Sequence, residues 1–199
     1  VSGEKAPPAA REATAETVPL PRVAIVLDDC GQVLDLMERA ARSRLPLTFA
    51  VIPHLPHSAR SAEIAHAAGH EVIVHQPMQP RSPDEDPGPR AIKPGLGVKA
   101  LSEILRASFA DVPHAVGLNN HMGSAATEDR ALMEALFAAL ERVRPGAIFL
   151  DSRTSAATVA AEVARRQGLP TAERAVFLDN EADPAAIRAA LARVVRLAG

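Results

Sequence analysis

Residues 69–75 read GHEVIVH: a glycine, a short apolar run rich in β-branched side chains, and a histidine where the run ends. A run this short and this composition predict a buried strand rather than a helix. Runs of the same kind recur along the chain, at Val23–Leu27, Leu47–Ile52, Glu71–His75, Ala115–Leu118, Ala147–Asp151 and Ala175–Asp179. Near-continuous apolar strands are typical of a parallel sheet whose faces are both covered.

Helical patterns with readable ends alternate with these runs. Ser58 is a predicted cap for a helix that ends before Gly69, and Thr127 for one that carries Leu132, Leu136 and Leu140 on one side. Further helices are expected between Ser155 and Gly168, and from Asp183-Pro184 onward, with Ile187, Leu191 and Val195 on one face. Strands alternating with helices predict an α/β fold with a parallel sheet, either open or closed into a barrel.

The composition fits a single domain and excludes some classes of protein. The 199 residues are 47% hydrophobic and 23% charged, with a formal net charge of −2. This near-balance argues against a nucleic-acid-binding protein, and no apolar run approaches the roughly 20 residues needed to span a bilayer. Cys30 is the only cysteine, and Trp and Tyr are absent, which argues against a wide groove lined with aromatic rings for a long glycan.

Two segments fall outside the alternating pattern. Residues 1–22 are rich in Ala, Pro and Glu and predict a linker, of the kind left when a signal peptide or anchor is removed, ahead of one domain at 23–199. Residues 76–97 hold six prolines and three glycines. A loop of this length often covers a site, so we expect a flap over the active site.

Polar side chains follow every predicted strand. The groups are Asp28-Asp29, His54 with His57, His75, Asn119-Asn120-His121, Asp151-Ser152-Arg153 and Asp179-Asn180. Functional groups gather at the carboxyl ends of strands in parallel α/β folds, so we expect these residues to share one rim.

Within this set, Asp29, His75 and His121 form a ligand set of two histidines and one carboxylate. Such a set favours Zn²⁺ or another divalent transition metal, with positions left for water and substrate. Adjacent carboxylates alternate in direction along a regular strand, so one of Asp28 and Asp29 can bind the metal while the other accepts a proton. The simpler alternative is that one of the two caps the turn at Gly31.

The other groups have alternative interpretations. His54 and His57 can contact substrate or shuttle protons, or belong to a surface turn. Asp151 and Arg153 can orient a catalytic group and hold a substrate anion, or simply pair with each other. Cys30 can approach the metal, although a small buried core residue is the commoner role for a free cysteine.

As a set, these motifs resemble the divergent polysaccharide deacetylase family. The resemblance rests on Asp28-Asp29, Pro53-His54-x-Pro56-His57, Gly69-His70-Glu71-Val72-x-x-His75-x-Pro77-Met78, Gly117-x-Asn119-Asn120-His121-Met122-Gly123-Ser124, Phe149-Leu150-Asp151-Ser152-Arg153-Thr154 and Phe177-Leu178-Asp179-Asn180. It runs from about Arg22 to the end of the chain. It implies a distorted β/α barrel of the NodB-homology type, an Asp-His-His metal site and hydrolysis of an N-acetyl group from an amino sugar.

The resemblance also implies roles for individual residues. Asp28 corresponds to the base, Asp29 to a metal ligand and His75 to the first metal histidine, while His121 is our own choice of third ligand. We expect catalytic residues at Asp28, Asp151 and His57, and substrate contacts from His54, Asn119, Asn120, Ser124, Arg153 and Asp179. The chain departs from the broader deacetylases at Gln79, where they place a second histidine, and at Asn119–Met122, which replaces an Arg-Pro-Pro-Tyr segment.

The expected function is that of a periplasmic or secreted hydrolase that uses a divalent metal, with Zn²⁺ as the expected ion, and acts on a carbohydrate or peptidoglycan-like substrate. Two alternatives remain open. One is a metal hydrolase acting on another bond of the cell envelope, such as a peptide, ester or phosphate linkage. The other is a non-enzymatic binding or assembly factor of the envelope that keeps an old metal site for stability.

Overall fold

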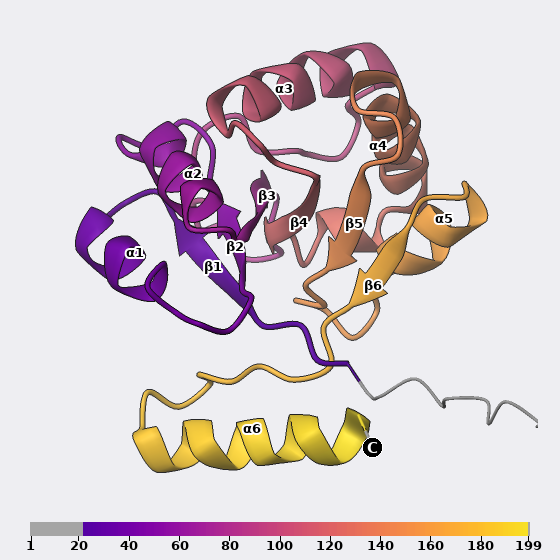
Figure 1. The fold of residues 1–199 in the computed structure, drawn as a ribbon. Helices are drawn as coiled ribbons and strands as arrows, with labels where there is room; N and C mark the ends of the chain where they lie inside the picture. Colours follow the sequence, from indigo (N-terminus) through magenta and orange to yellow (C-terminus); the bar gives the residue numbers. More distant parts are fainter. Residues whose placement is uncertain (1–21, 199) are drawn as a thin grey trace, which may run out of the picture.

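The computed structural model describes residues 22–198 (Figure 1). The predicted linker at residues 1–22 therefore lies, except for Arg22, outside the described residues. No helix within 22–198 has the length and apolar character needed to cross a membrane.

Six strands form one parallel sheet in the order β1-β2-β3-β4-β5-β6. The strands are β1 Val26–Cys30, β2 Thr48–Val51, β3 Glu71–Met78, β4 Gly117–Met122, β5 Ile148–Asp151 and β6 Thr171–Glu173. Each strand pairs with its neighbour in sequence, which is the strand order of a barrel. The predicted α/β fold is confirmed, as a barrel that stays open between β1 and β6 in the described residues.

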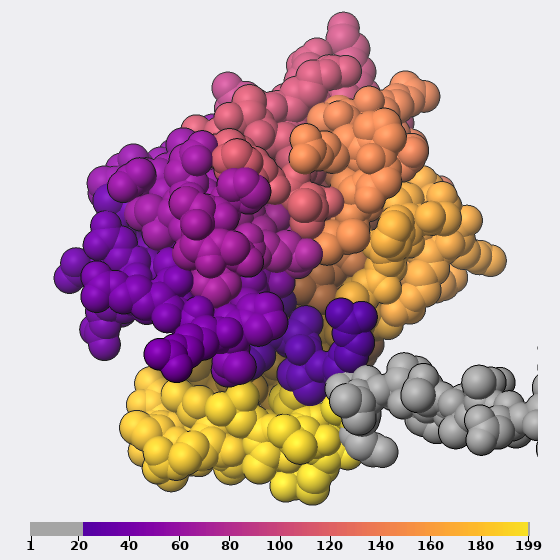
Figure 2. All heavy atoms as spheres, in the orientation of Figure 1, coloured from indigo at the N-terminus to yellow at the C-terminus, as the bar shows by residue number. Residues whose placement is uncertain are grey.

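Helices lie between successive strands, and one more follows the last strand, β6. They are α1 Leu34–Ala40, α2 Ser58–Ala67, α3 Val98–Asp111, α4 Arg130–Val143, α5 Ala160–Arg166 and α6 Pro184–Ala198, with a short 3₁₀ helix η1 at Ala126–Glu128. Parallel crossovers are right-handed, so a sheet built in sequence order receives its helices on one face. Figure 1 shows α1 to α5 around the sheet, and Figure 2 shows α6 as a layer along one side of the molecule.

The hydrophobic core lies between the sheet and these helices. Phe49, Val72, Val74 and Leu118 face it from the strands, and the ring of Phe149 packs edge-on against Phe137 of α4 with centroids 4.7 Å apart. Side chains alternate along a strand, so the residues between these positions point to the other face of the sheet. That second face carries His75 and Asn119, and it is the face on which the candidate site is built.

Several local expectations need correction. The run Ala175–Asp179 is not a strand: β6 lies earlier, at Thr171–Glu173. The guanidinium of Arg174 donates to the carbonyls of Ser152 and Arg153 and turns the chain away from the sheet. β1 lies about three residues later than expected, so Asp28 and Asp29 belong to the strand itself.

The helix starts also differ in part from the expectation. Asp129, not Thr127, caps α4 by accepting a hydrogen bond from the Leu132 amide, and α5 begins at Ala160, well after Ser155. Ser58 is the first residue of α2 rather than its cap. The expected cap of α6 is present, because Asp183 accepts hydrogen bonds from the amides of Ala185 and Ala186.

Candidate metal centre

The register of β3 and β4 places two polar side chains around one imidazole. His75 and Asn119 are cross-strand partners, so their side chains lie side by side on the inner face. His121 follows Asn119 by two residues and returns to that face. Asn119 Oδ1 lies 2.7 Å from Nδ1 of His75, and Nδ1 of His121 lies 3.2 Å from Nε2 of the same ring. The two residues of β4 therefore bracket the ring of His75.

The two aspartates of β1 complete the cluster through an irregularity in the strand. The β1–β2 register shifts between Leu27 and Cys30, and Asp29 has a left-handed backbone with φ 58°. A regular strand would turn Asp29 toward the helices. Instead Asp29 Oδ1 lies 3.2 Å from Nε2 of His75 and 2.9 Å from Nδ1 of His121. Both carboxylates therefore face the same histidine.

The three candidate ligand atoms fit a small divalent cation. Asp29 Oδ1, His75 Nε2 and His121 Nδ1 form a triangle with sides of 2.9, 3.2 and 3.2 Å. Tetrahedral zinc with bonds of about 2.0–2.2 Å to nitrogen and oxygen places its ligand atoms roughly 3.3 Å apart. Two imidazoles and one carboxylate are also a common donor set of catalytic zinc, so both geometry and chemistry fit.

Solvent reaches this cluster from one side only. The side chain of His75 is 4% exposed and that of His121 19%, whereas that of Asp29 is 66% exposed. An open position beside the ligands distinguishes catalytic metal sites from closed structural ones. The arrangement has the access that a substrate would need.

The charges in the cluster favour an ionised Asp29 and a neutral Cys30. Hydrogen bonds with His121, and then with His75, hold the pKa of Asp29 well below its usual range, against the opposing effect of partial burial. Burial, followed by the charges of Asp28 and Asp29, raises the pKa of the Cys30 thiol to about 12. The sulfur donates weakly to the carbonyl of Leu27. Cys30 is therefore a poor ligand at neutral pH, because metals bind the thiolate.

Left-handed backbone recurs where strands end. Besides Asp29, it occurs at His54 after β2, Met122 at the end of β4 and Arg153 after β5. Such conformations cost about 1–3 kcal/mol each in non-glycine residues and gather at functional sites. The backbone irregularities therefore mark the same rim as the polar side chains.

The comparisons with known proteins agree with this arrangement. The family model described as divergent polysaccharide deacetylase matches residues 25–199. The chain belongs to this family. It is 36% identical over 177 residues to the uncharacterized protein YibQ of Escherichia coli, and 37% identical over 163 residues to an uncharacterized protein of Haemophilus influenzae. These matches cover 89% and 80% of the chain but only 54% and 56% of the two relatives, so the chain spans about half their length.

Solved structures show the same fold. The uncharacterized protein ATU2773 of Agrobacterium tumefaciens superposes with a TM-score of 0.81 at 25% identity, over 93% of this chain and 75% of that one. The lactam utilization protein of Thermus thermophilus shares the fold alone, with a TM-score of 0.51 at 18% identity over 87% of this chain and 74% of that one.

In this member of the divergent polysaccharide deacetylase family, the buried carboxylate of β5 lies apart from the candidate metal cluster. Asp151 follows Phe149 by two residues, so its fully buried side chain points to the helices. There it accepts hydrogen bonds from the Thr158 hydroxyl and from the Arg153 amide. The side chain of Arg153 does not pair with Asp151, because it binds Glu173 instead.

The remaining predicted residues of the family motifs spread around the rim. Asn120 is buried on the helix side, where it binds the backbone at Met122 and Ser152, while Ser124 accepts a hydrogen bond from the Arg81 amide. The backbone amide of His54 donates to Asp111, at the end of α3. His57 precedes α2, and Asp179 is exposed between β6 and α6. The substrate contacts expected of these residues stay predictions.

Sequence reasoning gave no role to Ser152 and Thr158. The Ser152 hydroxyl accepts a hydrogen bond from the Asn119 amide at 3.2 Å, and the Thr158 hydroxyl binds Asp151 at 2.9 Å. Ser152 lies within a recognised strand-end motif, which was a usable signal. Thr158 lies in a connection with no motif, and only the folded structure brings it to Asp151.

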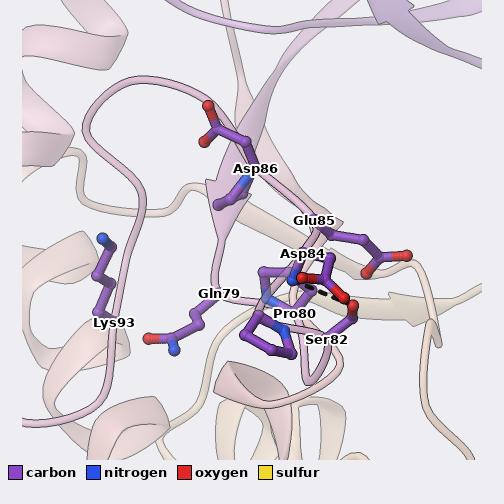
Figure 3. Close-up of a pocket in the computed structure, with 9 residues that line it drawn as sticks. Gln79, Pro80, Ser82, Asp84, Glu85, Asp86 and Lys93 are labelled. Atoms are coloured by element: carbon purple, nitrogen blue, oxygen red, sulfur yellow. Dashed lines mark hydrogen bonds between the residues drawn. The ribbon is translucent and has the colours of Figure 1, made fainter.

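The long loop after β3 is tied at both ends. The Gln79 amide donates to the Ile92 carbonyl, and the Ile92 amide donates to the Pro77 carbonyl, beside the bridge between Met78 and Ile92. Within the loop, a cavity of about 320 Å³ is lined by Gln79, Pro80, Ser82, Pro83, Asp84, Glu85, Asp86, Pro87 and Lys93 (Figure 3). No residue of the metal cluster lines this cavity, and the role of the loop as a flap stays a prediction.

Proposed function

We propose that this protein is a metal-dependent hydrolase that removes an acetyl group from an N-acetylated amino sugar, in a cell-envelope glycan outside the cytoplasm. The observation that carries the proposal is the triangle of Asp29, His75 and His121, with Asp28 Oδ1 3.7 Å from Nδ1 of the same imidazole. Membership of the divergent polysaccharide deacetylase family supports the bond and the substrate class.

A divalent cation, with zinc as the best match to the donor set, would supply Lewis-acid polarisation of the amide carbonyl and acidify a water molecule. Asp28 is the proposed general base. Its Oδ1 accepts a hydrogen bond from the Asn119 amide at 2.8 Å, which fixes the carboxylate and leaves Oδ2 for the proton.

The departing amine must be protonated for the amide bond to break. His121 belongs to the ligand set, so His57, at the start of α2, is the proposed general acid. Arg153 and Asp179, both exposed on the rim, remain the proposed contacts for polar groups of the sugar.

Acetate release tests the proposal directly. The substrates are N-acetylglucosamine oligomers and muropeptides, each offered to the chelated protein and to the protein reconstituted with zinc. Activity that appears with zinc and falls at least a hundredfold in Asp28→Asn is the expected result. The exposed Asp84→Asn makes the same chemical change in the loop and should keep wild-type activity.

Two outcomes would decide against the acetyl-sugar proposal. Zinc-dependent cleavage of a peptide, ester or phosphate bond, without acetate release, would show that the enzyme acts on another bond of the cell envelope. Stoichiometric zinc without any hydrolysis would instead favour a binding or assembly factor whose metal serves stability.

A further inference from the structure

Asn119 is buried inside the cluster, with its side-chain amide fully engaged. Only 1% of the residue is exposed. Its Nδ2 donates to Asp28 Oδ1 at 2.8 Å and to the Ser152 hydroxyl at 3.2 Å, while its Oδ1 lies 2.7 Å from Nδ1 of His75. An asparagine whose polar atoms are all hydrogen-bonded within the protein can position its neighbours without contacting substrate.

The partners of Asn119 determine which way its amide points. An ionised carboxylate only accepts hydrogen bonds, so the group that faces Asp28 must be the NH₂. The oxygen then faces His75, and an amide oxygen also only accepts, so Nδ1 of His75 must carry a proton. Turning the amide over would place two oxygens against each other at Asp28.

The proton at Nδ1 has a consequence at the other end of the ring. When a cation is bound, the imidazole of His75 is neutral and carries one proton, so a hydrogen at Nδ1 leaves the lone pair at Nε2 for the cation instead of a hydrogen bond to Asp29. Nε2 is the atom that lies 3.2 Å from both Asp29 Oδ1 and His121 Nδ1. Metal-binding histidines commonly have their other ring nitrogen fixed by an oxygen acceptor.

We propose that Asn119 is the positioning residue of this site. It accepts a hydrogen bond from the Nδ1–H of His75, directs the Nε2 lone pair to the cation and, through the same amide, holds Asp28. The proposal rests on the metal site of the proposed function but not on its substrate. It also explains why an asparagine occupies the register position opposite His75.

Zinc affinity is the first test, measured by competition with a chelating dye. Asn119→Leu keeps the approximate shape but offers no acceptor, and should bind zinc about 10–100-fold more weakly. Asn119→Asp keeps an oxygen against Nδ1 but removes the donor to Asp28, so it should recover only part of the affinity that Asn119→Leu loses. Ser152→Ala removes the neighbouring hydroxyl without touching His75 and should stay within about threefold of wild type.

The second test observes the proton itself, by ¹⁵N-edited NMR of the histidine rings in the zinc-loaded protein. The Nδ1 proton of His75 should be visible and slow to exchange in wild type and in Asn119→Asp, and lost to exchange in Asn119→Leu. A role in stability alone would change the unfolding temperature without this pattern.

The outcomes separate this inference from the proposed function. Wild-type zinc affinity in a folded Asn119→Leu would overturn it. If that variant does not fold, an Nδ1 of His75 without a proton in the zinc-loaded wild type would overturn it equally. A wild type that binds no zinc removes the metal site and the inference together, whereas absent hydrolysis with zinc binding that depends on Asn119 removes only the hydrolase.

Discussion

Asp28 and Asp29 are adjacent in the chain, yet their carboxylates lie near different nitrogens of one imidazole. Asp28 Oδ1 lies 3.7 Å from Nδ1 of His75, and Asp29 Oδ1 lies 3.2 Å from Nε2. The left-handed backbone of Asp29 produces this arrangement. It divides the pair into a carboxylate beside the candidate ligand atoms and a carboxylate beside Asn119.

This division predicts different effects of the same substitution at the two positions. Asp29→Asn replaces a charged ligand and should lower zinc affinity more than about a hundredfold, whereas Asp28→Asn should lower it less than about tenfold. Isothermal titration on both variants measures the difference.

Gln79→Ala tests whether a metal ligand lies at the position where the broader deacetylases are expected to have their second histidine. Gln79 lines the loop cavity, so its loss should leave zinc affinity unchanged.

Equal losses of zinc affinity in Asp28→Asn and Asp29→Asn would contradict the different roles assigned to the two carboxylates.

The metal-free protein should lose stability in acid through Asp29. Its pKa is lowered in the folded state from an ordinary value of 3.8, so the ionised carboxylate stabilises the fold above that value. This contribution disappears as the pH falls from there toward the lowered pKa. Urea unfolding in the presence of chelator should therefore show a steeper loss below about pH 4 for wild type than for Asp29→Asn.

An exposed loop carboxylate provides the comparison for this pH series. Asp84→Asn should follow the wild-type curve at every pH. Parallel curves for wild type and Asp29→Asn would show that the histidines do not stabilise the ionised carboxylate.

Asp151 should matter for stability through Thr158. Thr158→Val removes the hydroxyl from a fully buried carboxylate and should lower the free energy of unfolding by about 2 kcal/mol. Zinc affinity should stay the same, because Asp151 points to the helix side of the sheet. Thr154→Val, at an exposed hydroxyl that binds the Met122 carbonyl, should cost less than about 1 kcal/mol. A large loss of zinc affinity in Thr158→Val would connect Asp151 to the metal cluster.

Gly117 should be intolerant of any side chain because β4 and β5 approach closely there. A methyl group at this position would lie 2.2 Å from the Ile148 carbonyl oxygen. Gly117→Ala should therefore cost about 3 kcal/mol or more, as chemical denaturation would show. Gly97→Ala has nothing within 4 Å and should change stability by less than about 1 kcal/mol. Equal stabilities would mean that the two strands separate without cost.

The fold and the rim could be predicted because both depend on local pattern. Short β-branched runs such as Glu71–His75 predicted the strands, and the polar residue after each run predicted the edge at which Asp28, His75 and His121 lie together. Side chains alternate along a strand, and Asn119 and His121 are two residues apart on β4. They therefore lie on one face wherever the strand begins and ends.

Other features depend on contacts between distant segments and could not be predicted. The turn of Asp29 toward His75 requires the irregular register between β1 and β2. The strand-like run at 175–179 does not join the sheet, since Arg174 binds carbonyls of the β5 end. Asp151 looked like a rim residue, but its position two residues after Phe149 sends its side chain into the helix layer.

The sequential strand order also has a consequence for synthesis. Each new strand adds to the edge formed by the one before it, so a chain emerging from the ribosome can extend the sheet without waiting for a distant partner. Asp29 arrives with β1, His75 with β3 and His121 with β4. A cation present during translation would therefore meet all three candidate ligands once β4 has paired with β3, before β5 and β6 are added. It would then stabilise the incomplete sheet while much of its apolar surface is still exposed.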